Sequence, residues 1–246
     1  MKNIILIINT IFFLSTHVNA DDLKSQILSM KERAELRDLF LKDRMKTVLP
    51  EIMERTGVDM WIIIAREYNE DPVLRTMLPA TWLNARRRTI LVIYNPGRNM
   101  PLETFAIARY DVGNIFKKAW DPEQNPDQYG ALAELVKSKN PTKIALNQSK
   151  HFAQADGLTA TELRLFKKSL SRKMIKRIVS AEQLAIGWLE TRSELEMDYY
   201  PQICKIAHDI IKEGFSSNVI KPGETTTDDV VWWYRERIRD LKLVTW

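Results

Sequence analysis

The sequence predicts an α/β fold, with a mixed sheet flanked by helices. The first observation is a long helical pattern of apolar residues between charges over Asp22–Arg55. The second is a pair of near-continuous apolar runs rich in β-branched residues, Val58–Ala65 and Arg88–Tyr94, which is typical of strands covered on both faces. The third is the alternation of helix and strand patterns from there to Val179, which places helices on the faces of a sheet.

The first helix should end at Thr56-Gly57, since glycine is common just after a helix C-terminus. Pro50 lies inside it and is expected to kink or divide it. Asn95-Pro96-Gly97 breaks the chain after the second strand and predicts a hairpin-like connection. The capping-box pattern Thr159-Ala160-Thr161-Glu162 marks the start of a later helix. The remaining expected elements are a strand over Thr104–Tyr110, a helix over Tyr129–Ser138, a strand over Lys143–Asn147, a helix over Thr159–Leu170 and a strand over Met174–Val179.

From Ser180 onward the sequence predicts helices only. Two capping-box patterns open helices here, and a turn followed by a threonine-rich cap opens another. The longest of these helices contains Pro201, which should bend it. The segments are the caps Ser180–Gln183 and Thr191–Glu194, the helix that ends near Phe215, the turn Ile220–Gly223 and the cap Thr225–Thr227. Apolar stripes on the two long helices consist of Leu195, Tyr199, Ile203, Ile206, Ile210 and Ile211, and of Val230, Tyr234, Ile238 and Leu241.

The first twenty residues have the pattern of a secretory signal peptide. Lys2 precedes an apolar run from Ile4 to Leu14, and small residues stand at Val18 and Ala20. The alternative is a buried N-terminal helix, but the composition turns polar immediately afterwards. We therefore expect an exported protein, periplasmic or secreted, with no stable membrane insertion after the signal is cleaved. The single cysteine rules out an internal disulfide framework.

The charge of the chain does not mark it as a binder of nucleic acid. Its formal net charge is +5, and the basic residues are interleaved with acidic ones. No glycine-rich dinucleotide fingerprint and no P-loop is present in the sequence, so nucleotide binding has no support either.

The chain offers few candidates for nucleophilic or metal chemistry. Beyond the signal, the histidines are His151 and His208, and neither has a glycine-rich nucleophile turn near it. Cys204 and His208 are four residues apart on one predicted helix, so they could converge on a metal. Two ligands do not make a zinc site, and apolar neighbours favour core packing for this pair.

Three further groups allow a functional and a structural interpretation. Glu190, Glu194 and Asp198 could form an acidic ligand row, but a solvated helix N-terminus is favoured. The run Arg86-Arg87-Arg88 could hold a carboxylate or a phosphate, although composition alone favours the charged start of a strand. Trp232-Trp233 could stack on Arg237 or pack on protein outside this chain. None of these groups completes a catalytic constellation.

The C-terminal part resembles a known family. Ile178–Leu189, Thr191–Phe215 and the turn Ile220-Lys221-Pro222-Gly223-Glu224-Thr225 look like the opening of a pita-bread metallopeptidase domain, as in the creatinase, prolidase and Xaa-Pro aminopeptidase family. Residues Glu32–Asn147 are similar to the creatinase-type N-terminal domain that precedes it. After the expected signal peptide over residues 1–20, the resemblance implies a creatinase-like α/β domain over 21–179 and the start of an incomplete α+β pita-bread domain over 180–246.

The resemblance also implies a chemistry. Members of the family hydrolyse X-Pro peptide bonds with a water activated by two divalent metals, manganese, cobalt or zinc, held by two Asp, one His and two Glu. Those ligands lie downstream of the last helix here, so no catalytic or metal-binding residue is assigned to this chain, and its substrate-binding residues are left open. We expect the 246-residue chain to hold no cofactor and to be inactive alone. The alternative is a non-catalytic exported module for dimerisation or peptide binding, and a homodimer is one arrangement that the family uses.

Overall fold

The computed structural model describes residues 20–97 and 100–244, so the expected signal peptide lies outside the described residues except for its last one. The helices are α1 (Ala20–Ser25), α2 (Met30–Thr56), α3 (Pro72–Met77), α4 (Gln128–Lys139), α5 (Ala160–Ser169), α6 (Arg172–Ile175), α7 (Glu182–Glu190), α8 (Glu194–Gly214) and α9 (Thr227–Asp240). The strands are β1 (Met60–Arg66), β2 (Arg88–Tyr94), β3 (Glu103–Ile107), β4 (Lys117–Lys118), β5 (Ile144–Leu146) and β6 (Ile178–Ser180). The chain forms two compact units: Lys31–Tyr199 contains the sheet, and the segments on either side of it form a helical unit.

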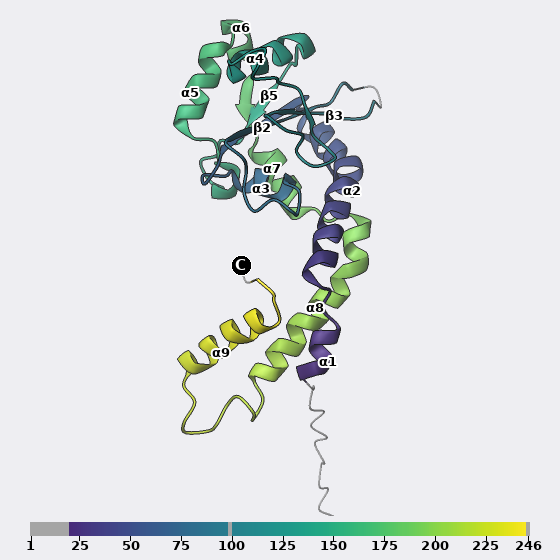
Figure 1. Ribbon diagram of the computed structural model, residues 1–246, viewed down its shortest axis with the longest axis vertical. Coiled ribbons are helices and arrows are strands. Elements are labelled where there is room, and N and C mark those ends of the chain that lie inside the picture. Colours follow the sequence, from purple (N-terminus) through teal and green to yellow (C-terminus); the bar gives the residue numbers. More distant parts are fainter. Residues whose placement is uncertain (1–19, 98–99, 245–246) are drawn as a thin grey trace, which may run out of the picture. The chain divides into compact units, whose positions relative to one another are not determined.

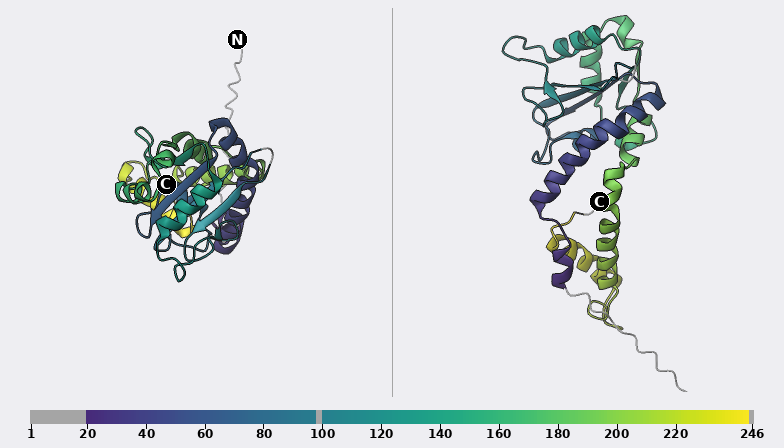
Figure 2. Two further views of the ribbon diagram at one scale, coloured as in Figure 1. Left: turned by 90° about the horizontal axis from the view of Figure 1, so that it is seen from above. Right: turned by 90° about the vertical axis from the view of Figure 1, so that its right-hand side faces the viewer.

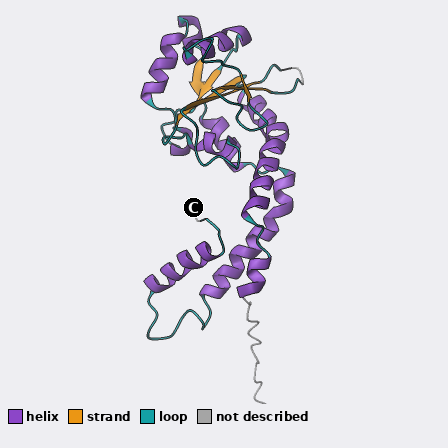
Figure 3. Ribbon diagram, in the orientation of Figure 1, coloured by secondary structure: helices purple, strands orange, loops and turns teal. Residues whose placement is uncertain are grey.

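The sheet has six strands in the order β4-β3-β2-β1-β5-β6. Figure 3 shows the strands in orange among the purple helices. Strand β2 is antiparallel to both of its neighbours, while β1 pairs in parallel with β5, β5 with β6, and β3 with β4. All strands except β2 therefore run in one direction. This mixed sheet with helices around it confirms the predicted α/β class.

Each face of the sheet is covered by its own layer of helices (Figure 1; Figure 2 gives two further views). Trp61 and Ile63 of β1 pack with the buried residues of α2, α3 and α7. Their neighbours Ile62 and Ile64 point the other way and pack with α4 and α5. Alternate side chains of a strand face opposite sides, so burial on both faces explains the continuous apolar run that the sequence shows.

The long N-terminal helix is divided at a different place from the one expected. The break lies between α1 and α2, at residues 26–29, and Pro50 lies within α2. Proline removes one helical hydrogen bond, but the buried residues on both sides of it, among them Leu49 and Ile52, hold this part of α2 against the sheet.

Two short helices were missed by the sequence analysis. Helix α3 begins at a proline, and the Asp71 carboxylate before it accepts hydrogen bonds from the backbone N–H groups of Val73 and Leu74. Helix α6 is capped by Ser171 and includes Met174 and Ile175, the first two residues of the segment expected to be a strand, and β6 begins only at Ile178. Both are shorter than the window over which a helical period can be recognised.

The helical unit has a small core of its own. Leu23 of α1, Ile210 of α8 and Leu241, just after α9, are buried together. Tyr234 donates a hydrogen bond to a backbone carbonyl of α8, and a Cβ on Gly214 would lie 2.3 Å from its ring, so only glycine permits this close approach. No residue of α9 itself is buried; of the apolar stripe expected on it, Tyr234 packs against this small core and Leu241, just after the helix, belongs to it.

Within the described residues, every helix is too short or too polar to cross a bilayer.

Candidate functional site

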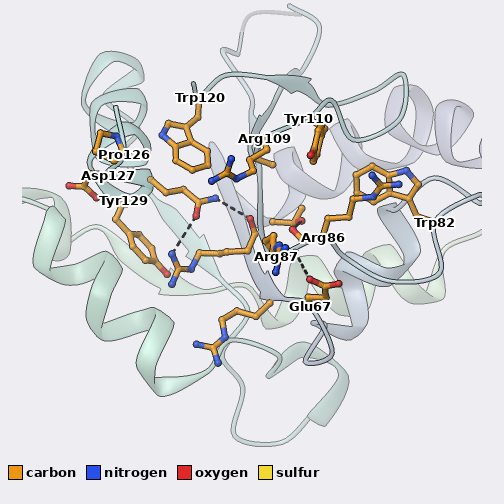
Figure 4. Close-up of a pocket in the computed structure, with 15 residues that line it drawn as sticks. Glu67, Trp82, Arg86, Arg87, Arg109, Tyr110, Trp120, Pro126, Asp127 and Tyr129 are labelled. Carbon is orange, nitrogen blue, oxygen red and sulfur yellow. Dashed lines mark hydrogen bonds between the residues drawn. The ribbon is translucent and has the colours of Figure 1, made fainter. Parts of the chain in front are cut away.

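A pocket of about 1020 Å³ opens at one edge of the sheet (Figure 4). It lies where β1 and β3 end and β2 begins, since these strands present their ends at the same edge. Ligands of open α/β sheets commonly bind at the carboxyl ends of the strands. Two kinds of side chain dominate the lining. They are the arginines Arg66, Arg86, Arg87, Arg88 and Arg109, and the aromatic residues Trp82, Tyr110, Trp120 and Tyr129.

The topology explains why the arginines gather. Arg66 ends β1, and its register partner in the antiparallel β2 is Arg88. Arg86 and Arg87 directly precede Arg88, and Arg109 follows β3 by two residues. The run Arg86-Arg87-Arg88, which the sequence analysis interprets as the charged start of a strand, therefore leads into β2 and also forms one wall of the pocket.

The buried carboxylate of Glu162, on α5, is the shared ion-pair partner of two of these arginines. Its Oε2 accepts a hydrogen bond from Arg88 Nε at 2.6 Å, and its Oε1 lies 3.6 Å from Nη1 of Arg66. The hydroxyl group of Tyr129 donates a hydrogen bond to the same carboxylate. Burial, and then the Glu162 carboxylate, raise the pKa of Tyr129 far above its ordinary value, so Tyr129 remains a neutral donor.

Gln128 fixes the start of α4 to the sheet edge. Its amide nitrogen donates to the backbone carbonyls of Ile107 and Arg88, at 2.6 and 3.1 Å. Its amide oxygen accepts from Arg88 Nη1 at 3.4 Å. Arg88 is thus held by Glu162 and Gln128 together, which orients it along the pocket floor.

The other three arginines are differently placed. Arg86 lies over the ring of Trp82, 4.7 Å from its centroid, and 5.7 Å from that of Tyr110. Arg87 has a positive φ of 56° and donates its backbone N–H to the Glu67 carboxylate at 3.1 Å. Among the described residues, the guanidinium groups of Arg86, Arg87 and Arg109 form no ion pair with a carboxylate, and all three side chains are exposed.

This arrangement suits an anionic ligand. Guanidinium groups bind carboxylate or phosphate oxygens through two parallel hydrogen bonds, and the aromatic residues of the lining offer apolar surface beside them. Two carboxylates, those of Glu67 and Asp127, also line the pocket, so the positive charge is concentrated on the walls that carry Arg86, Arg87 and Arg109.

A second polar cluster lies inside the same unit but away from the pocket. The fully buried Asp71 accepts hydrogen bonds from the side chain of Asn147 as well as from the start of α3. Asn147 in turn accepts from Trp61 Nε1 at 2.7 Å. Burial raises the pKa of Asp71, against the smaller opposite effect of these hydrogen bonds. A Cβ on Gly157 would lie 2.2 Å from the Asp71 carboxylate, so this glycine is required by close packing.

The candidate metal residues are not brought together. Cys204 and His208 are both exposed on α8, so the expected core packing of this pair is wrong. Among the described residues, no group of three or more His, Cys, Asp or Glu is placed to hold a metal ion. The described residues do not bring together the donor set of a two-metal centre. His151 is exposed in a loop.

The remaining candidates have structural roles. Glu190, Glu194 and Asp198 are exposed, as expected of solvated carboxylates. The cap of α8 forms two residues later than expected, between Ser193 and Glu196. Trp232 stacks with Arg235, its neighbour three residues on, because Arg237 pairs with Glu213 instead.

Of this site, sequence reasoning named only the run Arg86-Arg87-Arg88; it missed Arg66 and Arg109 of the lining. It also missed the role of the buried Glu162. Glu162 was assigned to a capping box with Thr159, and half of that box forms, since Glu162 N–H donates to Thr159 Oγ1 at 3.3 Å. Its carboxylate does not return to the Thr159 backbone; it turns inward to the arginines. A charge on the apolar side of an amphipathic helix was the signal available, because such a charge is rarely buried without a partner.

No protein-family model and no curated protein matches this chain. Among solved structures, it is similar to an Xaa-Pro dipeptidase from Bacillus anthracis, with a TM-score of 0.47 and 14% sequence identity. The match covers 89% of this chain and 50% of the other, so the chain spans about half the length of that protein.

Proposed function

We propose that residues 31–199 bind peptides by their carboxylates in the arginine pocket. The observation that carries this proposal is the presence of three guanidinium groups without a carboxylate partner among the described residues, on the walls of one cavity. A peptide carboxylate offers the planar pair of oxygens that a guanidinium binds best. The cavity has the size usual for small-ligand sites.

A second proposal concerns the whole protein, and the turn between α8 and α9 supports it. The backbone N–H of Lys221 donates to Thr225 Oγ1 at 2.9 Å, and Gly223 has a φ of 81°, which favours glycine. The next helix begins with a complete capping box of Thr226 and Asp229. These are the residues of the I-K-P-G-E-T motif and its following helix. On this basis the chain is the N-terminal part of an exported Xaa-Pro-type metalloaminopeptidase, in which the pocket contributes to peptide binding.

The two proposals are tested separately. For the first, a short peptide with a free C-terminus and the same peptide with a C-terminal amide are titrated into the full chain, and tryptophan emission from Trp82 and Trp120 is followed. The free acid should bind at least about tenfold more tightly, which corresponds to roughly 1.4 kcal/mol. Equal affinities would contradict carboxylate recognition.

For the second proposal, the 246-residue chain is assayed on an X-Pro peptide with added manganese. We expect no turnover, because the described residues lack the donor set that holds two metals. Turnover that is abolished by a chelator would show that the chain builds a metal centre and would overturn this part of the account.

A further inference from the structure

The charges of the pocket are divided into two groups. Arg66 and Arg88 share the single carboxylate of Glu162, which offsets about half of the positive charge of the floor. Arg86, Arg87 and Arg109 have no such partner among the described residues. Like charges gathered in one cavity repel each other, and a ligand that carries more than one negative charge relieves this repulsion better than a single carboxylate does.

The unpaired guanidinium groups also occupy two places. In Figure 4, Arg86 lies at the end of the pocket formed by Trp82, and Arg109 lies beside Trp120, with Arg87 between them. The cation–π contacts with Trp82 and Tyr110 keep Arg86 at its end. One carboxylate is small compared with a cavity of about 1020 Å³ and cannot engage both ends at once.

We infer that the pocket selects peptides that present two carboxylates at their end, which is the chemistry of a C-terminal aspartate or glutamate. One carboxylate is the main-chain terminus and the other is the side chain of the same residue. Arg86 receives one of them and Arg109 the other, and Arg87 adds positive charge between the two. This inference rests on the proposed peptide binding and specifies its ligand.

A compact polyanion is the competing chemistry. Guanidinium groups also bind phosphate oxygens, and inorganic pyrophosphate carries several charges in a small volume. The carboxylates of Glu67 and Asp127 in the lining oppose such a concentrated charge more strongly than they oppose two separated single charges. A spread dianion is therefore favoured.

The experiment uses four peptides that differ only at the last residue: glutamate or glutamine, each as the free acid or the amide. They are titrated into the full chain by calorimetry. We expect the glutamate acid to bind about tenfold more tightly than the glutamine acid or the glutamate amide, and about a hundredfold more tightly than the glutamine amide. Equal affinity of glutamate and glutamine acids would overturn the inference and leave carboxylate binding intact. If affinity depends neither on glutamate against glutamine nor on the free acid against the amide, the proposed function is contradicted as well.

Two variants test the division of roles. The four peptides define two preferences, glutamate over glutamine and free acid over amide. Arg86→Gln should abolish one of these preferences and keep the other, and Arg109→Gln should do the reverse. If both variants lose the same preference, the two-place arrangement is wrong. Arg164→Gln on α5, an exposed arginine outside the pocket, is the matched control and should keep both preferences. Far-ultraviolet circular dichroism of each variant establishes that it is folded.

The last experiment is a competition between pyrophosphate and the glutamate acid peptide. Pyrophosphate should displace the glutamate acid only at a concentration well above that peptide's dissociation constant. Displacement by pyrophosphate at a lower concentration would replace the dicarboxylate ligand with a phosphate-bearing one.

Discussion

Glu162 accepts a hydrogen bond from Nε of Arg88 at 2.6 Å, and this contact joins α5 to the first residue of β2. Only 1% of the Glu162 side chain is exposed. Its Oε1 has no hydrogen-bond partner in the described part of the chain, and the nearby Arg66 guanidinium supplies the countercharge. The contact between Glu162 and Arg88 therefore forms the floor of the pocket. The other arginines, on the walls, keep no carboxylate partner among the described residues.

Replacing Glu162 should destabilise the fold. Glu162→Gln leaves Arg88 and Tyr129 facing a neutral side chain in a buried place, and the loss of one partner of a buried ion pair costs about 3 kcal/mol. The measurement is the free energy of unfolding in urea. Glu123→Gln is the control, since this carboxylate is exposed and forms no ion pair with any described residue; it should change stability by less than about 0.5 kcal/mol. Equal effects of the two substitutions would show that the Glu162 contacts contribute nothing to the fold.

Asp71 should make stability depend on pH. Burial raises its pKa above the ordinary value of 3.8, so the folded state holds a proton that the unfolded state releases. The contribution of this group to stability is therefore complete below about pH 4 and is lost as the pH rises through the raised pKa. The variant Asp71→Asn has no titrating carboxyl group at this position, so it does not lose this stability as the pH rises.

The measurement is the difference in free energy of unfolding, Asp71→Asn minus the unmodified chain, between pH 4 and pH 7. We expect the difference to increase with pH. Asp198→Asn, at an exposed carboxylate, should show no such trend. A difference that falls with pH would mean that hydrogen bonds from Asn147 and α3 outweigh burial.

The two compact units should differ in hydrogen exchange. In β2 five of seven residues are buried, whereas α9 has none. Opening a segment with few buried apolar contacts costs little free energy. Amides of α9 should therefore exchange about a hundredfold faster than those of β1 and β2, as measured by mass spectrometry of peptides from the exchanged chain. Equal protection would indicate that α9 is held by contacts as extensive as those of the sheet.

The two long strands β1 and β2 were predicted well because burial on both faces leaves a strong local signal. The run RTILVIY coincides with β2, and the helix expected over Tyr129–Ser138 is α4, which ends at an asparagine in the left-handed conformation. These features depend on neighbouring residues only. The short helices α3 and α6 depend on single caps, Asp71 and Ser171, and therefore gave no periodic signal.

The pocket could not be predicted in the same way. Its arginines come from the end of β1, the start of β2 and the loop after β3, and only the sheet order brings them together. The run Arg86–Arg88 was visible in the sequence, but composition could not distinguish a solvated strand start from a pocket wall. The direction of the Glu162 side chain depends on the same non-local arrangement, because its partners are more than seventy residues away for Arg88 and further for Arg66.

The most direct test of the central claim is a calorimetric titration of a peptide ending in glutamate, as the free acid, into the unmodified chain and into the triple variant Arg86→Gln, Arg87→Gln, Arg109→Gln. If the walls of the pocket bind the carboxylates, the unmodified chain gives a saturable heat and the folded triple variant loses at least about a hundredfold in affinity, with Arg164→Gln unchanged. Undiminished binding by the triple variant would place the ligand elsewhere and contradict the account.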